Sequence, residues 1–336
     1  MCTAAIYQTQ NTYFGRNLDY DFSYGEETVI VPRNFPFHFR EAKSHDSHHA
    51  IIGIAYVADT PTNLLVNGTP KSYPLLYDAV NEKGLGIAGL NFVGNAVYNA
   101  HIDDKDNISQ FEFIPWVLSQ CATVSEAKTL LTKMNFRDLK FNDQLPIAEL
   151  HWIIADNTSS IVVESVADGL KIYDNPVGIL TNNPPFDEQL FHLNNYINLT
   201  NQEPVNRFAP NLNLQAYSRG MGAIGLPGDL SSQSRFVKAT FTKTHSLSAD
   251  DEMSSVSQFF HILYSVEQQY GCCDLGDNHY EHTLYSSCYN LEKGIFYYTT
   301  YNNHQISALN LHHVDLDSSE LFRYPITNIE QINYQN

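Results

Sequence analysis

Short apolar segments bounded by turn-forming residues dominate the hydrophobic pattern of the chain. Residues 4–9 and 12–18 form two such segments, and the polar pair Gln10-Asn11 between them predicts a β-hairpin. Asp-Asn and Asp-Gly pairs separate later segments in the same way, which is typical of tight turns between antiparallel strands. The further strand candidates are residues 28–31, 50–57, 86–92, 150–155, 160–164, 170–173, 178–180, 283–287, 294–300 and 305–311.

Apolar residues at helical spacing occur in three segments. A helix is predicted from Thr123, because Thr123 and Glu126 form a capping box ahead of an apolar stripe. A second helix is predicted over 254–269, and a third over 109–121 with an interruption near Pro115. Strands and helices do not alternate regularly. This order favours antiparallel sheets with helices on their outer faces over a doubly wound parallel sheet.

The chain of 336 residues shows no internal repeat and no convincing linker. We therefore expect a single domain over 1–336. The polar, proline-containing stretch 198–215 is expected to protrude from this domain rather than to separate two domains.

Charge and composition exclude several classes of protein. Lys plus Arg number 19 against 37 Asp plus Glu, a net charge of −18, so there is no basic footprint for nucleic acid. No apolar run approaches the roughly 18 residues of a membrane helix. The first residues carry neither the basic nor the apolar part of a secretory signal. We therefore expect a cytoplasmic protein with neither nucleic acid nor membrane as a partner.

Cysteine usage and short motifs do not indicate a disulfide framework, a metal or a nucleotide cofactor. The glycines of 220–225 fit a dinucleotide motif formally, but Pro227 and Gly228 then break the helix that the motif requires. The histidines at 45, 48 and 49 lack a second ligand pair at metal-site spacing. The five cysteines are too sparse to pair as a framework: Cys2, Cys121, Cys272, Cys273 and Cys288.

Cys2 is the candidate nucleophile. Met1 is usually removed when the next residue is small, and its removal would leave Cys2 with a thiol and a free α-amine. The pKa of an α-amine in peptides is about 8. Arg16 and Asp19 lie on the strand predicted to pair with the Cys2 strand, so the hairpin can bring them back beside it. A guanidinium near sulfur favours the thiolate, and a carboxylate can orient the amine. The alternative is a surface Arg–Asp pair of little energetic weight.

Seven motifs carry a family resemblance, in this order: Met1-Cys-Thr-Ala4, Tyr13-Phe-Gly-Arg-Asn-Leu-Asp19, Asn81 to Phe92, Leu180-Thr-Asn-Asn-Pro184, Gly225 to Phe236, Tyr285-Ser-Ser-Cys288 and Gly294-Ile-Phe-Tyr-Tyr298. Over its full length the chain resembles the choloylglycine hydrolase family, which includes bile salt hydrolases and penicillin V acylases. The resemblance implies an α+β fold, the four-layer αββα sandwich of N-terminal nucleophile hydrolases with two antiparallel sheets. It also implies hydrolysis of a non-peptide amide without metal or cofactor.

The resemblance also implies roles for six residues. Cys2 is the nucleophile, its α-amine is the base and then the acid, and Asp19 fixes that amine. The side-chain amide of Asn182 and the backbone N–H of Asn91 donate hydrogen bonds to the oxyanion. Two arginines flank the sulfur: Arg16 and Arg235.

The family that the chain resembles contains enzymes with different substrates. Asn at position 91 resembles bile salt hydrolases, whereas a group of penicillin V acylases carries Tyr there. This favours glycine- or taurine-conjugated bile salts. A penicillin V or other N-acyl amide acylase is the first alternative, and a non-catalytic binder of amphipathic steroids is the second. A steroid needs an apolar pocket. The candidate walls of this pocket are Leu18, Tyr20, Phe22, Tyr24, Phe136 and Leu139. For each of them, ordinary packing in the core is the alternative interpretation.

Two further segments bear on specificity and assembly. The stretch 58–72 is longer than the family pattern, and its counterpart in relatives borders the substrate entrance. The excursion over about 190–218 resembles the hairpin through which relatives form tetramers. The resemblance therefore implies a homotetramer.

Overall fold

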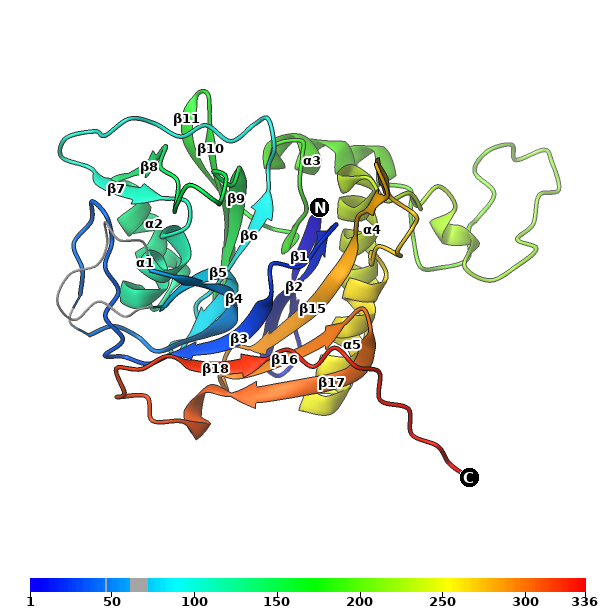
Figure 1. Cartoon of the computed structure of the whole chain (residues 1–336). Coiled ribbons are helices and arrows are strands. Elements are labelled where there is room, and N and C mark those ends of the chain that lie inside the picture. The colour runs from blue at the N-terminus through cyan, green and yellow to red at the C-terminus, as the bar shows by residue number, and fades with distance from the viewer. Residues whose placement is uncertain (46, 61–71) are drawn as a thin grey trace.

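Two antiparallel sheets form the centre of the molecule in a computed structural model that describes residues 1–45, 47–60 and 72–336 (Figure 1). The six-stranded sheet contains, in spatial order, β12 (Ile179–Leu180), β1 (Cys2–Gln8), β2 (Thr12–Tyr20), β15 (His282–Asn290), β16 (Ile295–Thr300) and β17 (Asn303–Asn310). The eight-stranded sheet contains β11 (Gly169–Asp174), β10 (Ser160–Val166), β9 (Leu150–Ala155), β6 (Gly86–Asn91), β5 (Ser72–Asn81), β4 (Ile51–Asp59), β3 (Glu26–Val31) and β18 (Phe322–Pro325). The sheets contact each other where β1 and β2 meet β6.

Helices cover the outer face of each sheet (Figure 1). On the eight-stranded sheet lie α1 (Phe113–Gln120) and α2 (Val124–Leu131), which pack on it through buried apolar residues. On the six-stranded sheet lie α4 (Ser232–His245) and α5 (Glu252–Tyr264), which contact β1 and other strands of that sheet. The layers therefore follow the order helix, sheet, sheet, helix, and the expected αββα arrangement is confirmed.

The eight-stranded sheet is buried on both faces because its central strands carry apolar residues at consecutive positions. Ile51 packs under α1 and α2, whereas Ile52 belongs to the cluster between the sheets. On β9, Ile154 likewise faces the helices and Ile153 faces the other sheet. Successive side chains of a strand point to opposite faces, so such runs suit a sheet in the middle of four layers.

The predicted N-terminal hairpin is confirmed. β1 and β2 pair antiparallel, with Cys2 opposite Leu18 and Ala4 opposite Arg16. Gly15 lies against β15: a Cβ at this position would lie 1.9 Å from the carbonyl oxygen of Ser287. Any larger residue would push β15 away from β2, so this glycine sets the close approach beside Arg16.

The helices differ from their predicted bounds. In α1 the helix begins at Phe113 and Pro115 lies in its first turn, where the missing N–H costs nothing, so the predicted interruption is wrong. α5 begins at Glu252, where Asp251 caps it by accepting a hydrogen bond from the Ser254 N–H at 2.9 Å, and it ends at Tyr264. The sequence pattern missed α4, whose Ser- and Thr-rich sequence has weak helix propensity.

Smaller elements were also missed. They include the two-stranded parallel pair of β7 (Asp106–Ser109) and β8 (Met134–Arg137), the short helix α3 (Phe186–His192), and the hairpin of β13 (Asp274–Gly276) and β14 (His279–Tyr280). Because β7 and β8 are only four residues long, their pattern is too short to distinguish from a loop.

The excursion over 190–218 extends away from the body of the molecule (Figure 1). Its residues form the end of α3, a short 3₁₀ turn (Leu193–Tyr196) and irregular chain, without a strand, so it is not a β-hairpin. Of the long stretch 58–72, residues 61–71 lie outside the described residues. Within the described part of the chain, no helix is long and apolar enough to cross a membrane.

Candidate active site

Cys2 is the first residue of β1, and the residue is 2% exposed. The thiol sulfur accepts a hydrogen bond from Nη2 of Arg16. The main chain of Cys2 is held on both sides. Its N–H donates to Oδ1 of Asn182 at 2.7 Å, and its carbonyl oxygen accepts from Nη1 of Arg235 at 2.6 Å. These contacts fix the thiol at one position at the junction of the two sheets.

Arg16 brings a buried positive charge to this thiol. Its Nη1 donates to the carbonyl oxygens of Gly89 and, at 3.4 Å, Tyr77, so the guanidinium spans from β2 to the opposite sheet. Burial by itself lowers the pKa of Arg16, but the facing groups, Cys2 first among them, outweigh it and hold that pKa above its ordinary value. The guanidinium therefore stays charged and favours a thiolate at Cys2.

Arg235, on α4, holds main chain and amide groups around Cys2. Its Nη1 donates to the Cys2 carbonyl and to Oγ1 of Thr3 at 2.6 Å, and its Nη2 donates to Oδ1 of Asn182 at 2.7 Å. Burial lowers the pKa of Arg235, an effect that Asp19 and Cys2 oppose. The structure places Arg235 beside Cys2, where its Nη atoms donate to the Cys2 carbonyl, Thr3 and Asn182 rather than to the thiol.

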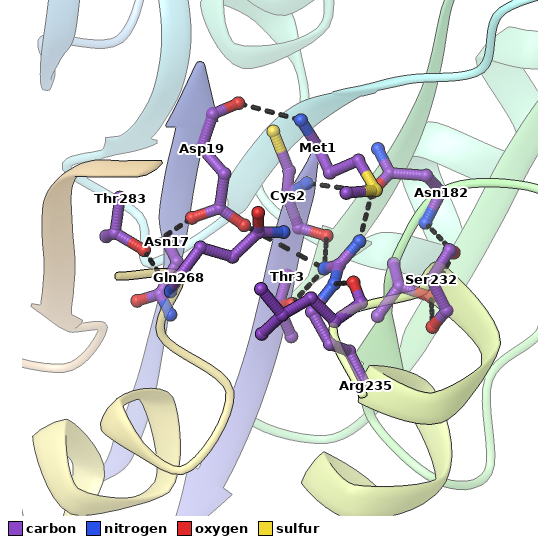
Figure 2. A network of polar contacts seen from close by, with 12 residues as sticks. Met1, Cys2, Thr3, Asn17, Asp19, Asn182, Ser232, Arg235, Gln268 and Thr283 are labelled. Carbon is purple, nitrogen blue, oxygen red and sulfur yellow. Dashed lines mark hydrogen bonds and ion pairs between the residues drawn. The ribbon is translucent and has the colours of Figure 1, made fainter. Parts of the chain in front are cut away.

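Asp19 lies beside the start of β1 (Figure 2). Its Oδ1 accepts from Oγ1 of Thr283 at 2.6 Å, whereas the buried Oδ2 accepts no hydrogen bond from any described residue. Nη1 of Arg235 lies 3.9 Å from that oxygen. Met1 pairs with the Asp19 backbone, because the Met1 ammonium donates to the Asp19 carbonyl at 2.8 Å and the Asp19 N–H donates to the Met1 carbonyl at 2.9 Å. Asp19 thus offers, next to the first residues of the chain, a carboxylate oxygen that accepts no hydrogen bond from the described residues.

Asn182 connects Cys2 to the opposite sheet. Its Oδ1 accepts from both Cys2 and Arg235 (Figure 2). Its Nδ2 donates to the carbonyl oxygen of Asn91 at 2.8 Å. The Asn182 backbone N–H donates to Oγ of Ser232 at 2.8 Å. With Oδ1 held by two donors, the orientation of the amide is fixed. One hydrogen of Nδ2 remains for another acceptor.

A cavity of about 340 Å³ opens beside the thiol. Its polar lining includes Cys2, Arg16, Asp19 and Asn91, whereas Asn182 and Arg235 are not part of that lining. Four of the six predicted walls line it: Leu18, Tyr20, Phe22 and Tyr24. Three of these form an aromatic cluster, in which the Phe22 ring lies 4.7 Å from Tyr24 and 5.1 Å from Tyr20 between ring centroids.

The other two predicted walls require correction. Phe136 is buried in the core, where its ring stacks on Trp152 at 4.6 Å and 6°. Trp152 itself lines the cavity, so Phe136 supports the wall from behind. Leu139 is not among the lining residues. Further walls were missed by the sequence pattern, among them Tyr56, Leu75, Phe111, Ile114, Phe141 and Ile147.

The missed walls come from segments far from the hairpin in sequence, and no local pattern distinguishes a cavity wall from core. For Leu75 the one available signal was its strand: a prediction of β5 would have placed Leu75 in the eight-stranded sheet. Across the described residues, no group of three or more His, Cys, Asp or Glu side chains is placed to hold a metal ion. His48, from the histidine-rich segment, instead bonds the carbonyl oxygens of Phe35 and His49.

The αββα sandwich, with a buried cysteine on its first strand, is the fold of the N-terminal nucleophile hydrolases. The chain belongs to the choloylglycine hydrolase family of linear amide C–N hydrolases, whose sequence profile matches residues 2–324.

Three known proteins show how close this relationship is. The bile salt hydrolase/transferase of Lactiplantibacillus plantarum is 56% identical over 326 residues, which cover 97% of each chain. The crystal structure of the mutant C2A conjugated bile acid hydrolase from Clostridium perfringens matches with a TM-score of 0.89 at 34% identity, covering 100% of both chains. Penicillin V acylase from Agrobacterium tumefaciens, at 19% identity and a TM-score of 0.72 over 96% of this chain and 90% of that chain, shares the fold.

Proposed function

We propose that this protein hydrolyses the amide bond of glycine- or taurine-conjugated bile salts, with Cys2 as the nucleophile. The observation that carries the proposal is that the Cys2 thiol accepts a hydrogen bond from a buried guanidinium and lines a largely apolar cavity. A steroid acyl group has the apolar surface that such a cavity buries. The names of the relatives at 56% and 34% identity support the same substrate.

In the proposed reaction, removal of Met1 frees the α-amine of Cys2, which Asp19 Oδ2 and Asn182 Oδ1 hold. The amine takes the thiol proton as the sulfur attacks the amide carbonyl. Nδ2 of Asn182 and the backbone N–H of Asn91 stabilise the oxyanion. The C–N bond then breaks, the ammonium returns its proton to the leaving amine, and a thioester remains.

Water completes the proposed cycle. The α-amine takes one proton from the attacking water, and the oxygen adds to the thioester carbon at the same oxyanion site. The C–S bond breaks, the free bile acid leaves, and the thiol regains its proton from the ammonium. In this scheme Arg16 keeps the sulfur anionic when it leaves, and every proton that is taken up is returned.

A substrate panel tests the proposal. Wild-type protein, with loss of Met1 verified by mass, is expected to release glycine from glycocholate and taurine from taurocholate at least about tenfold faster than it cleaves penicillin V. A difference of that size corresponds to about 1.4 kcal/mol in the transition state. Faster cleavage of penicillin V would favour the acylase alternative. Reversible binding of the bile salts without any hydrolysis would favour the steroid-binder alternative.

The location and the assembly are part of the same proposal. All five cysteines are free thiols, which suits the reducing cytoplasm. The homotetramer is supported by the excursion over 190–218, where several large apolar side chains are exposed within one segment of the chain. They are Phe191, Ile197, Val205, Phe208, Leu212, Leu214 and Tyr217.

Charges on this excursion are expected to break the assembly. Phe208 is 90% exposed and Tyr217 87% exposed, so the double variant Phe208→Asp, Tyr217→Asp should fold normally. Light scattering coupled to size exclusion is expected to give a tetramer for the wild type and a smaller species for the variant. Leu247→Asp, a change at an equally exposed leucine outside the excursion, is the matched control and should leave the mass unchanged. A monomeric wild type would contradict this part of the proposal.

A further inference from the structure

A buried histidine–glutamate pair lies under the loop that carries Asn182. His151 on β9 and Glu164 on β10 are each 0% exposed, and Nδ1 of His151 lies 2.9 Å from Oε1 of Glu164. The other ring nitrogen, Nε2, lies 2.8 Å from the carbonyl oxygen of Thr181. A carbonyl only accepts, so Nε2 carries a hydrogen. The remaining ring nitrogen, Nδ1, faces the carboxyl group of Glu164.

This pair holds the Asn182 loop at both ends. His151 bonds the carbonyl of Thr181, the residue directly before Asn182. Glu164 accepts hydrogen bonds from the backbone N–H of Phe186, at 3.1 Å to Oε1 and 3.4 Å to Oε2. The segment 181–186 is therefore anchored at its start and at its end by two side chains that also bond each other.

The same imidazole touches the segment of the second oxyanion donor. The rings of Phe92 and His151 stack in parallel, with centroids 4.3 Å apart and planes 6° apart. Phe92 directly follows Asn91, at the end of β6. Because Asn91 belongs to the eight-stranded sheet and Asn182 follows β12 of the six-stranded sheet, the ring of His151 lies between segments of both sheets.

Neither member of the pair belongs to the reacting groups. The residues that line the cavity include neither His151 nor Glu164. Burying two ionisable side chains is costly, and a buried pair of this kind is weak support for stability on its own. A role in geometry accounts for their position, because oxyanion donors must be held within about 0.5 Å of the productive arrangement.

We infer that His151 and Glu164 are positioning residues that fix Asn91 and Asn182 relative to each other and so build the oxyanion site. The inference rests on the proposed function, which gives Asn91 and Asn182 that role. The bonds from His151 to the Thr181 carbonyl and from Phe186 to Glu164 set the loop, and the stack on Phe92 sets the end of β6.

The test separates positioning from a general effect on the fold. His151→Gln is expected to lower kcat for glycocholate by about tenfold or more, because removal of an oxyanion donor outright costs about 10²–10³. KM should change by less than about threefold, since the cavity lining is intact. Alkylation of Cys2 by iodoacetamide should keep its wild-type rate, because that substitution at carbon develops no oxyanion.

A double-mutant cycle gives the sharpest readout. If His151 acts through Asn182, His151→Gln should lower kcat far less in an Asn182→Ala background than in the wild type. Glu164→Gln should retain most of kcat, because the amide can still bond Nδ1 of His151 and accept from the Phe186 N–H. Glu164→Leu should lose it. The control is His101→Gln, which breaks an exposed pair with Glu41 at 3.0 Å and should leave kcat unchanged.

The possible results distinguish the two levels of the argument. A folded His151→Gln with wild-type kcat, or effects of His151→Gln and Asn182→Ala that simply multiply, would overturn the positioning role. If His151→Gln does not fold, the Glu164→Leu and Glu164→Gln pair is compared by the same kcat, KM and alkylation measurements. If the wild type cleaves penicillin V but not bile salts, the proposed substrate fails, and the same cycle is then measured with penicillin V.

Discussion

Replacement of Cys2 by alanine is expected to abolish hydrolysis of glycocholate, with a loss of at least about 10⁴-fold in kcat, the scale seen when a nucleophile is removed. The change deletes one sulfur atom and leaves the backbone contacts of Cys2 with Asn182 and Arg235 in place. Arg16 loses its sulfur partner but keeps its bonds to the carbonyl oxygens of Gly89 and Tyr77. We therefore expect a folded, inactive protein, measured by glycine release and by an unchanged far-UV circular dichroism spectrum.

Two variants frame this result. Cys288→Ala removes another fully buried thiol, one whose pKa burial raises well above its ordinary value, so it should keep activity within about twofold apart from any loss of stability. Cys2→Ser should be strongly impaired, because a hydroxyl is a far weaker nucleophile than a thiolate. Wild-type turnover by Cys2→Ala would show that another group attacks the amide, and the proposed mechanism would fall.

The part of the site that the sequence could predict is the part that is local in the chain. The hairpin of 4–9 and 12–18 was recognisable from its pattern. Its register puts Leu18 opposite Cys2, and so brings Arg16 and Asp19 to the thiol end of the sheet. A short hairpin has few alternative pairings, so the proximity of these three residues follows from local spacing.

The remaining site residues join Cys2 only through long-range packing. Asn91 ends β6 of one sheet, Asn182 follows β12 of the other, and Arg235 reaches Cys2 from α4. No pattern in the sequence states which sheet face meets which, and α4 itself was missed. The family resemblance alone brought these three residues together in advance. It did not predict that Arg235 would bond the Cys2 carbonyl rather than its sulfur.

The walls of the cavity illustrate the same limit. Tyr20 ends β2, and Phe22 and Tyr24 lie in the chain directly after it, so their nearness to the thiol follows from their place just beyond the hairpin. Phe136 has the same aromatic character, yet the sheet turns it toward the core, where it stacks on Trp152. Apolar composition selects residues that are removed from water, but it does not separate those that face a cavity from those behind it.

Activity is also expected to require the removal of whatever precedes Cys2. With Met1 in place, the Cys2 nitrogen is part of a peptide bond and donates its N–H to Asn182. An amide nitrogen has no basic lone pair, so it can neither take the thiol proton nor protonate the leaving amine. Asp19 Oδ2 then lacks the ammonium that it is proposed to hold, in agreement with its missing hydrogen-bond partner. General acid–base catalysis of this kind contributes about 10²–10⁴-fold.

A removable extension tests this requirement within one polypeptide. The chain is produced with a peptide that a site-specific protease cleaves directly before Cys2, and mass spectrometry follows the cleavage. Hydrolysis of glycocholate should rise from background by about 10²-fold or more as the new N-terminus appears. The same extension on Cys2→Ala should give no activity before or after cleavage. In the uncleaved chain the residue before Cys2 pairs with the backbone of Asp19, and the Cys2 nitrogen is an amide that cannot act as a base. Full activity of that chain would therefore mean that another base serves the thiol.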